Sequence, residues 1–144
     1  MAYQVGRVLH ERFALPVTVV GPDISEDSFF QYAVRFPVLS PDMLPGVIRE
    51  HDILVATGGF ARYWLGLQLK CLKICYVQSV SSYSVLDGFY DVYAFSARFV
   101  QDYALKHFNV SGPVINPSIN TKLFDGGINW DDRDNSFMAL SYKQ

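Results

Sequence analysis

The fold is decided by residues 52–78, which read DILVATGGFARYWLGLQLKCLKICYVQ. Two largely apolar runs within this stretch, DILVAT at residues 52–57 and LKICYVQ at residues 72–78, predict short strands. A pair of glycines turns the chain after the first run, and the apolar residues that follow predict a helix over about residues 60–69. A strand, a helix and a second strand in this order indicate two parallel strands joined by a right-handed crossover.

The same alternation continues on both sides of this stretch. Toward the N-terminus, the pattern predicts a helix, two strands (the second a weak one) and a short helix, over residues 1–15, 17–21, 30–36 and 40–50. Toward the C-terminus, it predicts a strand, a helix and a last strand, over residues 91–95, 97–108 and 113–116. Ser96 is placed to cap the last helix, and Asn109 to end it. The predicted fold is therefore α/β, with a doubly wound, mostly parallel sheet.

The composition suits a single globular domain. The chain has 144 residues, half of them hydrophobic, which is enough to build a core without a disulfide or a metal. Twelve basic side chains against 14 acidic ones leave a net charge of −2, so the overall charge does not draw the chain toward nucleic acid.

Neither a cleavable leader nor a membrane-spanning segment is predicted. Arg7, Glu11 and Arg12 interrupt the first apolar runs, and no run approaches the roughly 20 apolar residues of a spanning helix. Cys71 and Cys75 are four residues apart, which is not the spacing of a redox or zinc pair. Two buried free thiols fit a reducing compartment. The expected location is cytoplasmic, or at the inner face of a membrane.

Two motifs of the C-terminal half carry a resemblance to a known family. Residues 94–100 read AFSARFV and residues 114–124 read VINPSINTKLF. In this order and at this spacing, they resemble the N-terminal domain of retaining GT-B glycosyltransferases, which has a Rossmann-like sheet. The second motif matches the family's domain boundary, with Asn120 where the family has an aspartate and Ser118 in place of its usual turn residue. The YVQ strand end is similar to that of a rhamnosyltransferase-like subgroup.

The resemblance implies a division of the chain and an activity. Residues 1–125 would be the acceptor-side domain without its first strand, and residues 126–144 the linker and the start of a donor-binding domain that the chain lacks. The parent enzyme would move a sugar from a nucleotide-sugar donor to a carbohydrate or lipid-linked acceptor, in cell-surface polysaccharide synthesis. Because this chemistry needs two domains to stabilise the leaving diphosphate and exclude water, we expect the chain alone to be inactive.

The candidate site residues follow the predicted strands, at the edge where such sheets bind ligands. Gly58 and Gly59 would present backbone N–H groups to an anion or a sugar hydroxyl, or would simply make a tight turn. Gln78 and Ser79 could hydrogen-bond an acceptor sugar, or belong to a solvated polar loop. Many family members have a histidine near the position of Gln78. Since an amide does not titrate, no catalytic residue is assigned.

Four further residues complete the predicted substrate-binding set. Ser96 is first of all a helix cap, and Arg98, in the first turn of that helix, could reach a phosphate. Asn116 and Asn120 belong to the boundary motif, and their assignment rests on the resemblance alone.

No metal and no other cofactor is expected. His10, His51 and His107 are scattered, without a carboxylate or cysteine at ligand spacing. The region around Trp64 mixes basic and aromatic residues, at Arg62, Tyr63, Lys70 and Lys73. It would form either a patch that contacts a membrane peripherally or, with Trp64 buried, part of the core.

Two other functions remain open. The chain could be a non-catalytic half-fold that binds a sugar or a partner, because a sheet without its central strand would expose edges for another chain, including a second copy in a homodimer. It could also resemble the sugar-nucleotide epimerases of the GT-B class. The loops after the strands are poor in acids, which favours the transferase over the epimerase.

Overall fold

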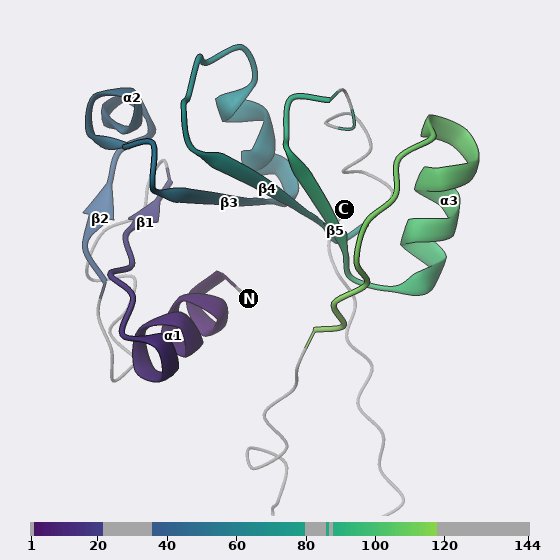
Figure 1. Ribbon diagram of the computed structural model, residues 1–144, viewed down its shortest axis with the longest axis horizontal. Coiled ribbons are helices and arrows are strands. Elements are labelled where there is room, and N and C mark those ends of the chain that lie inside the picture. The colour runs from purple at the N-terminus through teal and green to yellow at the C-terminus, as the bar shows by residue number, and fades with distance from the viewer. Residues whose placement is uncertain (1, 22–35, 80–85, 87, 118–144) are drawn as a thin grey trace, which may run out of the picture.

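The computed structural model describes residues 2–21, 36–79, 86 and 88–117. Its centre is a parallel sheet of three strands, β3 (Ile53–Thr57), β4 (Leu72–Val77) and β5 (Val92–Phe95), in the order β3-β4-β5 (Figure 1). The register pairs Val55 with Ile74, and Ile74 with Val92. The three strands expected over residues 52–57, 72–78 and 91–95 are therefore confirmed, as is their parallel direction.

A second, smaller sheet precedes this one. Strands β1 (Val19–Val20) and β2 (Val38–Leu39) pair in parallel, with Val19 opposite Val38. The strand expected over residues 17–21 is thus present, although shorter. Most of the weak strand expected over residues 30–36 lies outside the described residues, and β2 begins only after Pro37.

The strand expected over residues 113–116 was wrong in extent. A single parallel bridge joins Phe95 to Val114, with the Phe95 N–H donating to the Pro113 carbonyl and the Ile115 N–H donating to the Phe95 carbonyl. Pro113 has no N–H to donate, so it cannot extend this ladder backward.

The helices differ more from the expected pattern. Helix α1 covers Ala2–Phe13, and a 3₁₀ turn, η2 (Pro41–Met43), leads into the single turn α2 (Leu44–Val47). The helix expected over residues 60–69 is instead a 3₁₀ helix, η3 (Gly58–Trp64). Ala61 and Trp64 are both buried. Because a 3₁₀ helix repeats every three residues, it turns both side chains toward the sheet. Gly66 then ends the segment with a φ of +84°.

The core lies on one face of the three-stranded sheet. This face carries the buried side chains Leu54, Ala56, Cys75, Val77, Tyr93 and Phe95. Trp64 of η3 packs in the same cluster, together with Val100 and Ala104 of helix α3 (Arg98–Phe108). Trp64 is thus a core residue. Cys71 and Cys75 are free and buried, as expected, and burial raises the pKa of the Cys71 thiol.

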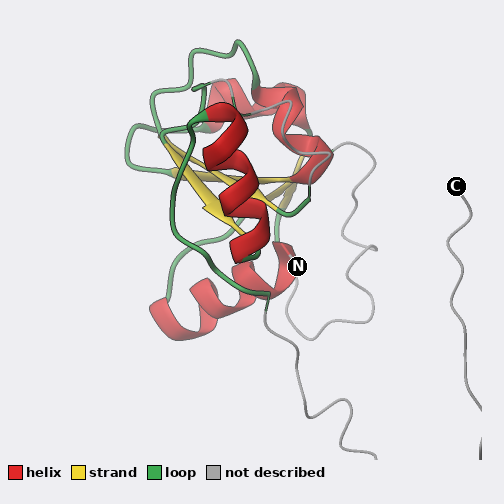
Figure 2. Ribbon diagram, turned by 90° about the vertical axis from the view of Figure 1, so that its right-hand side faces the viewer, coloured by secondary structure: helices red, strands yellow, loops and turns green. Residues whose placement is uncertain are grey.

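Helices cover the sheet from more than one direction. Figures 1 and 2 show α1 and η3 on opposite sides of the three-stranded sheet, with α3 alongside β5. No described helix is both long enough and apolar enough to cross a lipid bilayer. The observed architecture is an α/β fold with parallel strands.

Candidate functional site

The candidate site is the carboxyl edge of the three-stranded sheet, defined here as residues 57–59, 78–79, 96–98 and 115–116. The register pairs Thr57 with Tyr76, and Val77 with Phe95, so the three strands end side by side. The residues that follow them, Gly58, Gln78 and Ser96, therefore come from neighbouring strands. In parallel α/β sheets, ligands bind at this edge.

Gly58 and Gly59 open η3 directly after β3. Thr57 precedes them in an extended conformation (φ −132°, ψ 145°), and its side chain makes no capping hydrogen bond. The two glycines therefore make the turn from β3 into η3 at the carboxyl edge. This is the turn that the sequence predicted for them.

Ser96 ties two strand ends together instead of capping α3, so the predicted cap was wrong. Its N–H donates to the Val77 carbonyl at 3.0 Å, and its hydroxyl donates to the Gln78 carbonyl at 3.1 Å. The N-cap residue is Ala97, in an extended conformation (φ −158°, ψ 157°) and without a side-chain capping bond. Because Ser96 still follows the line of β5, its hydroxyl is directed at the end of β4.

Gln78 and Ser79 lie at the end of β4, where Ser96 holds the Gln78 carbonyl. The Gln78 side chain is half-buried and Ser79 is exposed, and both have interaction partners within the protein. Amide and hydroxyl groups both donate and accept hydrogen bonds. This part of the carboxyl edge therefore carries amide and hydroxyl groups beside each other.

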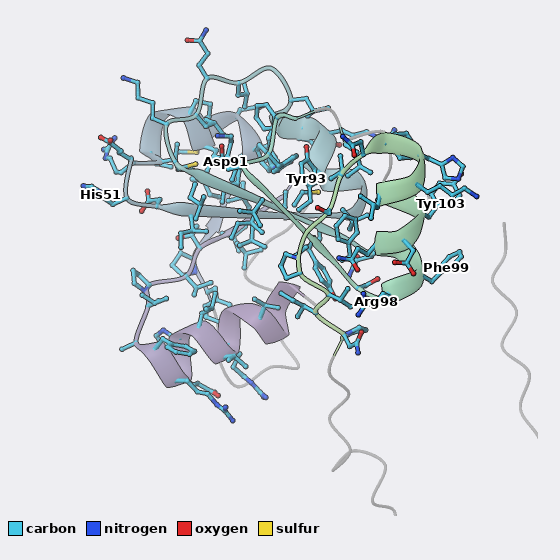
Figure 3. The ribbon with its side chains drawn as sticks, turned by 45° about the vertical axis from the view of Figure 1, so that its right-hand side comes forward. His51, Asp91, Tyr93, Arg98, Phe99 and Tyr103 are labelled. Carbon is cyan, nitrogen blue, oxygen red and sulfur yellow. The ribbon has the colours of Figure 1, made fainter. Side chains whose placement is uncertain are left out.

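Arg98 is the first residue of α3 and is exposed. Figure 3 shows it at the amino end of the helix, while Phe99 and Tyr103 point away from the sheet. Arg98 makes no ion pair with any residue that the structure describes. Its guanidinium can therefore meet an anion that approaches the edge beside β5.

Asn116 is brought to the same edge by a contact that the sequence does not reveal. The Tyr76 hydroxyl donates to the Ile115 carbonyl at 2.7 Å, across 39 residues of sequence. The register partner of Tyr76 is Ala94, whose single methyl group leaves room for the ring to cross β5. Asn116 follows directly and is exposed, while Asn120 lies outside the described residues.

Tyr76 is a residue of the edge that sequence reasoning missed. Burial raises the pKa of its phenol, which favours further the protonated form that donates to Ile115. The available signal was a tyrosine next to the last residue of a mostly apolar strand. A tyrosine at such a position often directs its hydroxyl to a hydrogen-bond partner, but the position does not identify Ile115.

A structural ion pair lies at the amino ends of β4 and β5, opposite the carboxyl edge. Lys73 Nζ lies 2.9 Å from Asp91 Oδ2, and the Lys73 N–H donates to the same oxygen at 2.7 Å. The ammonium also lies 5.8 Å from the centre of the Phe89 ring. These two Lys73 donors hold the pKa of the Asp91 carboxyl below its usual value. The Lys73 ammonium is thus paired with Asp91 at the amino ends of the strands.

The basic and aromatic residues near η3 divide between the core and the surface. Trp64 is buried, whereas Arg62, Tyr63 and Lys70 are exposed. This arrangement agrees with the core interpretation of Trp64. Within the described ranges, no three His, Cys, Asp or Glu side chains gather closely enough to hold a metal ion.

The fold and the carboxyl edge define a class, an α/β protein whose parallel strands end in polar residues. Comparison with protein-family models, with curated proteins and with solved structures finds no match for this chain.

Proposed function

We propose that this chain is the acceptor-side part of a glycosyltransferase that moves a sugar from a nucleotide-sugar donor to a carbohydrate or lipid-linked acceptor. One observation carries the proposal. Gly58, Gln78 and Ser96, three positions singled out in the sequence as substrate contacts, follow three neighbouring parallel strands and share one edge. A ligand at this edge would meet all three loops together.

The chemistry of the edge suits a sugar and a phosphate. Gln78 and Ser79 offer amide and hydroxyl groups that match the donors and acceptors of a sugar ring. Arg98 adds a cation that suits the phosphate of a nucleotide sugar or of a lipid-linked acceptor. A lipid-linked acceptor would also bring the protein to the inner face of a membrane, in a cytoplasmic setting.

The proposal includes the finer fold. The sheet would be the doubly wound, Rossmann-like sheet of a GT-B N-terminal domain over residues 1–125, followed by the start of a donor-binding domain over residues 126–144. The parallel strands and the helices on opposite sides of the sheet support this view. So does the parallel direction of β1 and β2.

Catalysis is assigned to no residue of this chain. None of the residues 57–59, 78–79 and 96–98 carries a carboxyl group, so the loops after the strands offer no general acid or base there. The same point disfavours an epimerase, which needs such groups. We therefore expect residues 1–144 by themselves to bind ligands weakly and to transfer no sugar.

The test is a titration of the ¹⁵N-labelled chain, followed by NMR. The probes are UDP-glucose, dTDP-rhamnose and the methyl glycosides of glucose and rhamnose, each to about 10 mM, so that binding with a Kd on the order of 1 mM is detected. We expect shifts at the amides of Gln78, Ser79 and Arg98.

Two substitutions and a matched control sharpen the test. Arg98→Ala should weaken binding of the nucleotide sugars by about tenfold, and Gln78→Ala should weaken binding of the glycosides. Arg49→Ala, which removes an exposed arginine after α2, should change neither. Shifts that gather away from the carboxyl edge, or no shift with any probe, would contradict the proposed function.

A further inference from the structure

Helix α3 carries an exposed stripe on the side that is turned away from the sheet. Its four residues follow the helical spacing of three, four and seven positions, which places them on one side of the helix. They are Phe99, Asp102, Tyr103 and Lys106, and we call them the α3 stripe. Val100 and Ala104, on the other side, are buried in the core. Figure 3 shows Phe99 and Tyr103 pointing away from the sheet.

The aromatic part of the α3 stripe is unusually exposed. Phe99 is 68% exposed, the highest value among the large apolar side chains that the structure describes, and Tyr103 is 38% exposed. The Tyr103 ring stacks on the His107 ring, with 4.2 Å between their centres. Aromatic side chains are enriched at protein–protein interfaces, while a lone exposed one on a monomer gains nothing from burial. The α3 stripe is therefore suited to a protein partner.

The charged part of the α3 stripe is balanced. Asp102 and Lys106 lie one helical turn apart and are both exposed. Neither forms an ion pair with any residue in the described ranges. A surface that carries one acid and one base beside its aromatic rings complements a second surface of the same kind. This balance favours a second copy of the chain over a strongly acidic or strongly basic partner.

The charge pattern also sets the orientation of such a pair. A two-fold dimer uses the same surface on both copies. Parallel helices would place Asp102 beside Asp102 and Lys106 beside Lys106, and like charges repel. In antiparallel helices, with axes about 8–10 Å apart, the two-fold axis passes between Asp102 and Tyr103. Phe99 then lies opposite Lys106 of the second copy, whose ammonium can reach both the Phe99 ring and the Asp102 carboxylate.

We propose that the α3 stripe binds the α3 stripe of a second copy, in antiparallel orientation, and so forms a homodimer. The rings of Phe99 and Tyr103 make its apolar centre, and two ion pairs between Lys106 and Asp102 flank this centre. Arg98 begins α3 at the carboxyl edge, so antiparallel pairing leaves the two carboxyl edges at opposite ends of the dimer. This inference does not depend on the proposed function.

The short length of α3 limits the affinity of the dimer. Its 11 residues span about 16 Å, so the helix pair buries less than the roughly 800 Å² per partner that is typical of stable complexes. We therefore expect a Kd on the order of 100 µM. At a few µM, the concentration of an ordinary unfolding experiment, the chain is then almost entirely monomeric.

The test is sedimentation equilibrium of the full 144-residue chain between about 10 and 500 µM, a range that brackets the expected Kd. We expect one monomer–dimer equilibrium. Phe99→Glu places a carboxylate in the apolar centre and should leave the chain monomeric at every concentration. The matched control is Phe13→Glu, since Phe13 is 64% exposed at the end of α1. This control should leave the equilibrium unchanged, and circular dichroism shows whether both variants are folded.

A pair of charge reversals identifies α3 as the contact. Asp102→Lys would bring lysines together across the interface, and Lys106→Asp would bring aspartates together. Each variant alone should therefore dimerise at least about tenfold more weakly than the parent. When the two variants are mixed in equal amounts, a stripe with two lysines meets a stripe with two aspartates. The mixture should associate at least as tightly as the parent, and less tightly at 1 M salt.

Three results would overturn the proposal. One is a chain that stays monomeric at about 500 µM, which would assign the α3 stripe to a different partner. Another is a dimer that Phe99→Glu does not weaken, because the contact would then lie elsewhere on the molecule. The third is a mixture of the two charge variants that associates no better than either variant alone.

Discussion

At the scale of single residues, Gly112 shows how closely the backbone packs beside β5. A Cβ atom at this position would overlap the carbonyl oxygen of Tyr93, which is fixed in the sheet. The Gly112 carbonyl also accepts a hydrogen bond from the Gln101 amide at 2.6 Å, so the segment cannot move away freely. We expect Gly112→Ala to lower the free energy of unfolding by about 3 kcal/mol, measured by urea denaturation.

The control for this substitution is Gly46→Ala. Gly46 is exposed on α2, and a Cβ there meets nothing within 4 Å. Alanine also has the higher helix propensity, so this change should be neutral or stabilising by up to about 1 kcal/mol. If the two variants lose equal stability, Gly112 is not in close contact with β5.

A second prediction at this scale concerns Asp91 and pH. Its pKa is lowered by the donors of Lys73, so its ionised form stabilises the fold. The contribution is complete above the ordinary aspartate pKa of about 3.9 and is lost as pH falls through the lower folded value. Because the carboxyl is nearly half exposed, Asp91→Asn should cost only about 1 kcal/mol at pH 7.

The measurement is urea denaturation of both proteins at pH 7 and near pH 3. The difference between them should shrink at the lower pH and at 1 M salt. Asp102→Asn is the control, since Asp102 is exposed on α3 and has no ion-pair partner among the described residues. A loss for Asp91→Asn that is equal at both pH values would show that the charge is not responsible.

At the scale of elements, helix α3 ends at an asparagine in the left-handed conformation. Asn109 has a φ of 55°, and its N–H donates to the Leu105 carbonyl at 3.1 Å. Glycine adopts this conformation without strain, asparagine tolerates it, and alanine does so at a cost. We expect Asn109→Gly to stabilise by about 0.5 kcal/mol and Asn109→Ala to destabilise by about 1 kcal/mol.

Thermal unfolding of these two variants gives the order directly. Lys106→Ala, at an exposed position inside α3, should change stability by no more than about 0.3 kcal/mol and controls for helix propensity. If Asn109→Ala is as stable as the parent, the left-handed end of α3 does not form in solution.

Some of the helices and strands could be predicted from the sequence, and others could not. The runs that form β3 and β4 are largely apolar, with Lys73 as the one charged residue, so their existence and parallel pairing were predictable. The 3₁₀ form of η3 was not, because apolar residues stand at both three- and four-residue spacings over residues 60–69. The observed N-cap residue of α3, Ala97, lies one residue after the predicted Ser96. The Ser96 hydroxyl bonds to the Gln78 carbonyl instead of capping the helix, and this long-range bond could not be predicted from the local sequence.

The candidate site was predictable only in part. Gly58, Gln78, Ser96 and Arg98 could be assigned to one edge because parallel strands end together. The bond from Tyr76 to Ile115 could not be predicted, since it joins residues 39 apart and depends on the register of three strands. Local sequence patterns were therefore sufficient to assign four residues to the carboxyl edge. The hydrogen bond from Tyr76 to Ile115, which holds Asn116 at this edge, depends on the assembled sheet.

At the scale of the whole molecule, the sheet order sets where the fold opens first. Strand β4 is paired on both sides, and its Cys75 and Val77 are fully buried. Strand β3 is paired on one side among the described residues, and β1 and β2 have two residues each. Amides at the centre of a sheet exchange only on large-scale unfolding, whereas those at an edge exchange through local opening.

Hydrogen exchange followed by NMR tests this order. We expect the amides of β4 to exchange slowest, and every second amide of β3, directed away from β4, to exchange on the order of 100 times faster. The remaining β3 amides donate to β4 and serve as an internal control on the same strand. If both sets are equally slow, the side of β3 that is directed away from β4 is covered in solution.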